Sequence, residues 1–136
     1  MKLIFNKVLA VVVGIAAGSM AMMSVEKVGQ IVFEWPVGED AHNPIIVETF
    51  IRETTFLALV FLALAWAFGS WLGGLFTGLV AKSNGILLAL IVGTFFVFVS
   101  ILTLNTIKHP VWFWILGLSV ILPSAYCGAR IGSKRK

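Results

Sequence analysis

Four long stretches of the chain are almost entirely apolar, and polar or charged residues separate them. They run from about residue 8 to 25, 54 to 81, 85 to 106 and 111 to 129. A helix needs about 20 mostly apolar residues to cross a bilayer, and none of these stretches shows the polar–apolar alternation of a membrane β-strand. The pattern therefore predicts an all-α membrane protein, with four transmembrane helices in a single domain that covers residues 1–136.

Two of the three connections between these stretches are short. Lys82, Ser83 and Asn84 join the second stretch to the third, and residues 107–110 join the third to the fourth. Connections of this length place consecutive helices side by side and in opposite directions. We therefore expect an antiparallel four-helix bundle.

Residues 26–53 form the one longer connection. Asn43 followed by Pro44 is typical of a helix cap with proline in the first turn. Apolar residues then recur at helical spacing as far as Glu53. We expect a helix from Pro44, and we interpret it as able to run unbroken into the second apolar stretch.

Small residues recur every fourth position in all four stretches. In lipid, helices associate through close backbone approach at such positions. The rows predict helix-packing residues at Gly14, Gly18, Gly69, Gly73, Gly74, Gly78, Gly93 and Gly128. The second stretch has two rows, so we expect it at the centre of the bundle. Packing within one chain is the favoured interpretation, and a seam for a second copy or a partner is the alternative.

Composition changes the picture by excluding a soluble domain. The chain is 60% hydrophobic and 12% charged, whereas soluble domains carry about 25% charged residues. A globule of this size is mostly surface and cannot hide so much apolar area. The net charge of +4 does not indicate nucleic-acid binding, because no basic stripe interleaved with aromatic residues exists outside the apolar stretches.

The distribution of charge predicts the orientation of the chain. All six acidic residues lie between Glu26 and Glu53. Most basic residues fall on one side of a chain that crosses the membrane four times, at Lys2, Lys7, Lys82, Arg130 and the end of the chain. The positive-inside rule then places both termini in the cytoplasm and residues 26–53 outside.

The first apolar stretch has a second interpretation, as a secretory signal peptide. Lys2 and Lys7 precede it, and the small residues at 19 and 21 resemble a cleavage site. The apolar stretch is longer than the core of a usual signal peptide. We therefore keep it as a membrane span.

The candidate metal ligands are Glu39, Asp40 and His42 in the long connection. Carboxylate and imidazole groups bind metals, but this spacing matches no known motif. The favoured interpretation is a solvated acidic turn, so we expect no metal and no cofactor.

Enzyme motifs are missing from the sequence. It has no HExxH, no GxSxG and no Gly-rich phosphate loop, and we expect no catalysis. The interiors of the four predicted spans carry hydroxyl groups but no ionisable side chain, which argues against an ion-coupled transporter. Trp66 and Trp71 lie near mid-span, where bulk against small-residue faces is favoured over the lining of a pocket.

The function predicted by this elimination is a non-catalytic interaction or accessory subunit in the lipid bilayer. Its partner would be a membrane protein or a second copy of the chain. The alternative is a channel or carrier for a small neutral or lipophilic solute. A carrier should show a polar cavity open to one side, whereas an accessory subunit should show an uncovered face of small residues.

Three sequence motifs carry a resemblance to a known group. They are residues 62–69 (LALAWAFG) with Gly73 and Gly74, residues 109–114 (HPVWFW), and residues 122–126 (LPSAY) with Gly128. Together they resemble an uncharacterised family of small bacterial four-helix inner-membrane proteins. The resemblance implies the four-helix fold and a bacterial inner membrane, and it implies no activity.

Overall fold

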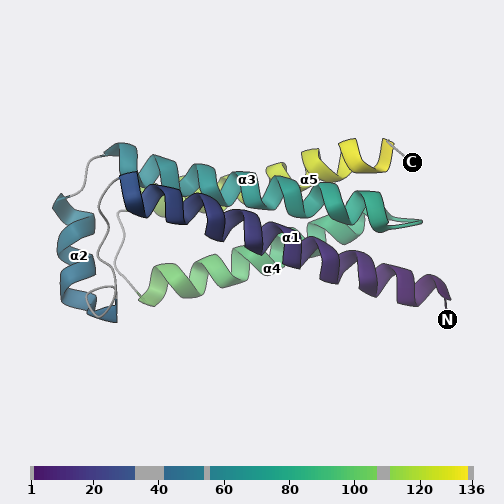
Figure 1. Cartoon of the computed structure of the whole chain (residues 1–136), viewed down its shortest axis with the longest axis horizontal. Helices are drawn as coiled ribbons and strands as arrows, with labels where there is room; N and C mark the ends of the chain where they lie inside the picture. Colours follow the sequence, from purple (N-terminus) through teal and green to yellow (C-terminus); the bar gives the residue numbers. More distant parts are fainter. Residues whose placement is uncertain (1, 33–41, 54–55, 107–110, 135–136) are drawn as a thin grey trace.

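The computed structural model describes residues 2–32, 42–53, 56–106 and 111–134. Within these ranges the chain forms five α-helices, which are α1 (Lys2–Val32), α2 (Pro44–Glu53), α3 (Phe56–Val80), α4 (Gly85–Thr106) and α5 (Val111–Lys134). Figure 1 shows α1, α3, α4 and α5 packed lengthwise into an elongated bundle, with α2 at one end. We call that end the α2 end. The opposite end, where both termini lie, is the terminal end.

The four long helices are long and apolar enough to cross a membrane. The shortest apolar span, Gly85–Asn105, has 21 residues. At 1.5 Å per residue it is roughly 32 Å long, close to the bilayer core of about 30 Å. These lengths and compositions agree with the prediction of four membrane-spanning helices, which is the architecture of a multi-pass membrane protein.

Helix α1 is longer than the sequence predicted. It continues through Glu26 to Val32, whereas the apolar pattern ends at about residue 25. Glutamate and lysine are good helix formers, so Glu26 and Lys27 do not interrupt the helix. As a result Glu26 occupies a helical turn with a defined direction relative to the other helices.

The predicted helix from Pro44 is present as α2. The side-chain oxygen of Asn43 accepts a hydrogen bond of 3.0 Å from the backbone N–H of Ile45, as a helix cap does. Its continuation into the second span as one straight helix is wrong, because α2 runs across the direction of α3 in Figure 1. Residues 54 and 55 lie outside the described residues.

Helices α1 and α3 run in opposite directions. Asn6, near the start of α1, contacts Val80 at the end of α3. Glu26, late in α1, contacts Trp66 in the first half of α3. The contacts of α1 are mainly with α3, and fewer are with α4.

Helix α3 lies at the centre, because its contacts with α5 and α1 are the most extensive in the bundle and it also contacts α4. Its neighbour α5 runs in the same direction: Trp66 meets Gly117, and further along Gly78 meets Ala129. Short turns favour contacts between consecutive helices, yet α3 packs more extensively on α5 than on α4. The close approach that small residues allow, rather than the short turn, therefore decides which helix packs most extensively on α3.

A tight turn joins α3 to α4. Asn84 adopts a left-handed backbone conformation, with φ 56°, which asparagine tolerates better than most residues. Its carbonyl accepts a 3.0 Å hydrogen bond from the N–H of Leu88, so it closes the first turn of α4. The four residues 81–84 are thus enough to reverse the chain.

Large side chains fill the interior, and other large side chains cover the exterior. Among the described residues, one buried cluster joins α3, α4 and α5 through Leu59, Ala63, Trp66, Val92, Phe96, Leu104, Phe113 and Ile121. Exposed leucine, isoleucine, valine and phenylalanine side chains lie along the outside of all four long helices. Such a surface suits lipid, which solvates apolar groups well.

Candidate functional site: helix seams and the Glu26–Trp66 contact

The seam between α1 and α3 is built from four glycines. A Cβ atom on Gly18 would lie 2.8 Å from the carbonyl oxygen of Gly69, and one on Gly73 would lie 2.9 Å from that of Gly14. Real Cβ atoms do not approach so closely, so only glycine allows this contact. A Cβ on Gly14 would also overlap the Thr77 hydroxyl.

A second seam joins α3 to α5. A Cβ on Gly74 would overlap the carbonyl of Ala125, and one on Gly78 would lie 2.6 Å from the carbonyl of Ala129. From the other side, a Cβ on Gly128 would overlap the carbonyl of Trp71. The neighbours here are backbone atoms, so the two helices touch main chain to main chain.

Gly93 on α4 has a looser environment. A Cβ there would lie 3.0 Å from Leu122 and 3.2 Å from Ala125, and both contacts are with side-chain atoms. The structure thus places all eight predicted packing glycines against another helix of the same chain. It places Gly117 and Gly132 there as well. Gly132 follows Ser124 and Gly128 at intervals of four residues, and this spacing could have identified it. Gly117 has no such spacing, because it faces the large ring of Trp66.

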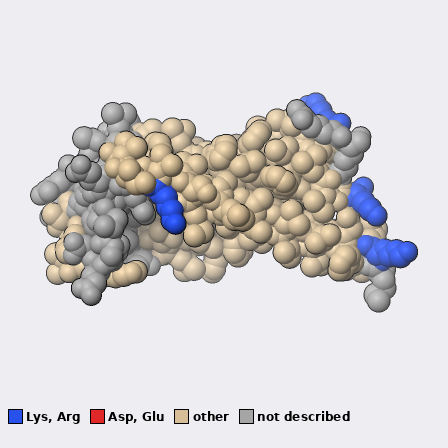
Figure 2. Space-filling view, in the orientation of Figure 1, with Lys and Arg blue, Asp and Glu red and all other residues tan. Residues whose placement is uncertain are grey.

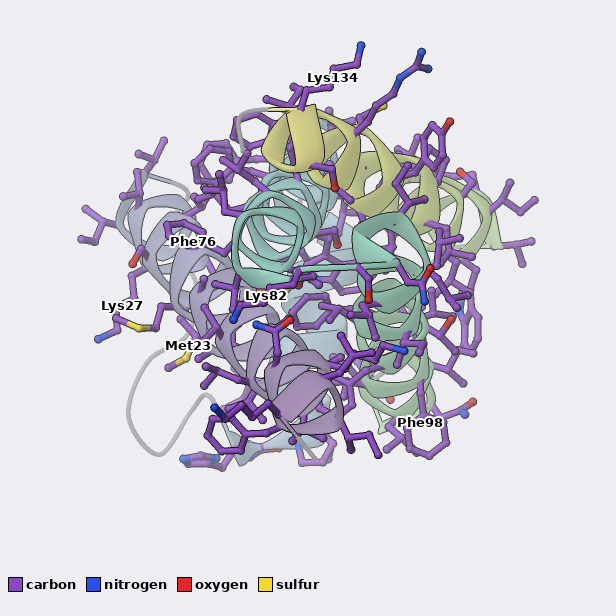
Figure 3. The ribbon with its side chains drawn as sticks, turned by 90° about the vertical axis from the view of Figure 1, so that its right-hand side faces the viewer. Met23, Lys27, Phe76, Lys82, Phe98 and Lys134 are labelled. Atoms are coloured by element: carbon purple, nitrogen blue, oxygen red, sulfur yellow. The ribbon has the colours of Figure 1, made fainter. Side chains whose placement is uncertain are left out.

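Every glycine that the structure describes has a neighbour from another helix of this chain. Other helices of the same chain therefore cover the faces that these small residues form. Large apolar side chains occupy the exterior instead, for example Phe98 on α4 and Met23 on α1, which both point away from the bundle in Figure 3. The uncovered face of small residues expected of an accessory subunit is therefore not found among the described residues. Such a subunit would have to meet its partner through large side chains.

Asn6 forms a bridge at the terminal end. Its side-chain amide donates a 3.0 Å hydrogen bond to the carbonyl of Val80, and its side-chain oxygen accepts a 2.8 Å hydrogen bond from the N–H of Lys82. The last carbonyls of a helix lack partners within the helix, and Asn6 supplies one from α1. The sequence signalled Asn6 only as a polar residue between Lys2 and Lys7.

Glu26 makes the corresponding link towards the α2 end. The indole Nε1 of Trp66 donates a 3.2 Å hydrogen bond to Oε1 of Glu26. Trp66 is 5% exposed and packs against Phe113, with ring centroids 5.3 Å apart. It therefore fills space as favoured from the sequence and also carries a polar contact. That the span interiors carry no charged side chain stays a prediction; Glu26 follows the predicted first span and lies three residues before the end of the candidate span Lys2–Gly29.

Buried hydroxyl groups on α3 differ in how they are satisfied. Thr77 donates a 2.7 Å hydrogen bond to the carbonyl of Gly73 one turn earlier. Ser70 is fully buried, and its hydroxyl has no hydrogen-bond partner among the described residues. Trp66, Ser70 and Thr77 lie on one face of α3, at spacings of four and seven residues, and they form its polar stripe.

The candidate metal ligands are not brought together by described residues. His42 is exposed just before α2, while Glu39 and Asp40 lie outside the described residues. Within the described ranges, no group of three or more acidic, histidine or cysteine side chains is placed to hold a metal ion.

No family model matches this chain, and neither a curated protein nor a solved structure matches it. The resemblance to small bacterial four-helix inner-membrane proteins therefore stays a prediction. The clearest candidate site is the contact between the Glu26 carboxylate and the Trp66 indole among the apolar helices.

Proposed function

We propose that this chain is a multi-pass protein of a bacterial inner membrane, an antiparallel bundle with both termini in the cytoplasm. Figure 2 supports this orientation, because most basic residues on the visible face gather at the terminal end, although one further basic side chain lies towards the α2 end. Lys2, Lys82 and Lys134 belong to that end by their positions in the fold. The positive-inside rule assigns such an end to the cytoplasm, and the connection that contains α2 to the outside.

Its role in this proposal is that of a non-catalytic interaction or accessory subunit. The supporting observation is the exposed apolar exterior, with large side chains such as Met23 and Phe98. The glycines of the α3–α5 seam are covered by α5 and leave no small-residue face open. Phe113 and Ile121 fill the interior beside this seam without exposed area. What the described bundle offers to another molecule is therefore its long apolar exterior.

One observation favours the alternative, a carrier of a small neutral or lipophilic solute. The polar stripe of Trp66, Ser70 and Thr77 faces the inside of the bundle, and Ser70 lacks a partner among the described residues. Unsatisfied hydroxyls inside a membrane bundle are costly. A hydroxyl-bearing solute would satisfy such a group if the helices separated.

The first experiment is affinity purification of the tagged chain from its native membrane in a mild detergent, with mass spectrometry of what copurifies. Recovery of a membrane protein in near-equal amount supports the accessory role. A tagged four-helix protein of similar size supplies the background. A Gly74→Leu variant, in which the α3–α5 seam cannot close, should lose the partner.

Recovery of this chain alone, or of copies of itself only, would contradict the role of subunit in a larger assembly. Flux of small neutral solutes into liposomes that contain the purified chain then tests the alternative. The carrier proposal requires flux above that of empty liposomes. It also requires a change in that flux when Ser70 is replaced by alanine.

A further inference from the structure

Glu26 is the only acidic residue within the four apolar spans. Its carboxylate reaches Trp66, which lies seven residues after Leu59, the start of the apolar span in α3. Seven residues of helix correspond to roughly 10 Å. The carboxylate therefore meets α3 within its apolar span, towards the α2 end of the bundle.

The direction of the carboxylate is set by a rigid neighbour. The ring of Trp66 is held between Phe113 and Gly117, because a Cβ on Gly117 would lie 2.8 Å from it. With the ring held in place, its N–H points at α1 and meets Glu26 at 3.2 Å. The contact is thus built by α1, α3 and α5 together, and it is not an accident of one flexible side chain.

Among the described residues of α1, α3, α4 and α5, no cation is placed to neutralise the carboxylate. Helices α3 and α4 contain no ionisable side chain at all. In α5 the ionisable groups are Tyr126, Cys127, Arg130 and Lys134, all in the half towards the terminal end. Lys27 follows Glu26 on α1, but it is exposed and points away from the bundle in Figure 3.

A carboxylate among apolar helices is costly unless a partner compensates its charge. One indole N–H offsets part of that cost, because a hydrogen bond to a charged acceptor is stronger than a neutral one. Binding of a proton removes the remaining cost by removing the charge. It also weakens the hydrogen bond from Trp66, since a neutral carboxyl group is the poorer acceptor.

We propose that Glu26 is a proton-binding site inside this membrane bundle and that Trp66 senses its protonation. In the charged state the Glu26–Trp66 hydrogen bond ties the second half of α1 to α3. In the protonated state this tie is weaker, while the glycine seam and the Asn6 bridge still hold the first half of α1. The site does not depend on the accessory role proposed above.

The test follows the indole N–H resonance of Trp66 by NMR in detergent micelles, from about pH 4 to pH 9, which covers the range for a perturbed carboxyl group. A Trp66→Phe variant assigns the resonance by its disappearance. The expected result is a single titration step in the wild-type chain. The step should be absent from Glu26→Gln, whose amide oxygen still accepts the hydrogen bond but cannot bind a proton.

Lys27→Gln is the matched control, because it changes the neighbouring charge on the exposed side of α1. The Trp66 step should persist in it. A wild-type Trp66 resonance that stays constant over the whole range would overturn the proposal. So would a step that survives in Glu26→Gln, because another group would then be titrating.

A second measurement does not require any variant to fold. A lipophilic carbodiimide modifies protonated carboxyl groups within membranes, and mass spectrometry locates the adduct. We expect the adduct on Glu26, in an amount that rises as the pH falls. Failure to modify Glu26 at any pH would count against a protonated state of this residue.

Discussion

The side-chain oxygen of Asn6 lies 2.8 Å from the backbone nitrogen of Lys82, although the two residues are 76 positions apart. The same side chain also bonds the carbonyl of Val80. One amide thus satisfies two main-chain groups at the end of α3 and joins the start of α1 to the α3–α4 turn.

Replacement of Asn6 by alanine should therefore destabilise the bundle. Two part-buried main-chain groups lose their partner, and a typical hydrogen bond is worth about 0.5–1.5 kcal/mol. The measurement is equilibrium unfolding in mixed micelles, followed by circular dichroism. Phe5→Ala is the control, because Phe5 is exposed and its loss should change the unfolding free energy little. Equal effects of the two variants would contradict the bridge.

Alanine should be tolerated far better at Gly93 than at Gly74. A Cβ at Gly93 meets side chains that can shift by a few tenths of an ångström, whereas a Cβ at Gly74 meets the main chain of Ala125. Overpacking of this kind costs about 1–3 kcal/mol, and we expect that cost at Gly74 only. Unfolding in mixed micelles ranks the two variants.

The control for size is Ala16→Leu, which adds bulk at an exposed position of α1. It should leave the unfolding free energy unchanged. If Gly93→Ala proves as costly as Gly74→Ala, the distinction between side-chain and main-chain neighbours does not hold.

Removal of the Ser70 hydroxyl should not destabilise the protein. Its oxygen is buried and has no partner among the described residues, so Ser70→Ala removes a desolvated polar atom and leaves no other group unpaired. We expect an unfolding free energy equal to that of the wild type or slightly higher. A loss of more than about 1 kcal/mol, the worth of a typical hydrogen bond, would show that the hydroxyl has a partner.

The proposed orientation is tested by cysteine labelling in a Cys127→Ser background. Ile45 is 74% exposed on α2, and Lys134 is exposed at the end of α5. A membrane-impermeant maleimide added to spheroplasts should label Ile45→Cys and should label Lys134→Cys only after the membrane is broken. Labelling of both positions, or of Lys134→Cys alone, in intact spheroplasts would contradict the orientation.

The sequence predicts the spanning helices well, but it predicts less well which helices pack against each other. Hydropathy is a local property, so the stretches that became α3, α4 and α5 can be recognised without a neighbour. Two rows of small residues on one stretch also indicate a central helix, as α3 is. Which face of α3 meets which helix is not a local property. The closeness of α3 to α5, two helices that run in the same direction, appears only in the assembled bundle.

The candidate site was harder to predict for the same reason. Glu26 reads as the residue that ends an apolar stretch, and Trp66 reads as bulk in another stretch 40 positions away. Neither residue has a motif. Their pairing depends on α1 continuing as a helix past Glu26 and on the ring of Trp66 being oriented by Gly117 and Phe113.

By itself, the sequence determined the four apolar helices, the positions of the small residues that allow close helix contact, and the end of the bundle at which positive charge gathers. These follow from composition and spacing, because lipid requires every spanning segment to satisfy its own backbone. Only the tertiary structure decided that α2 lies across the bundle, that Asn6 bridges to Lys82, and that Glu26 meets Trp66. Those contacts join distant segments, and in lipid they depend on close packing between particular faces rather than on hydrophobicity, which all four helices share.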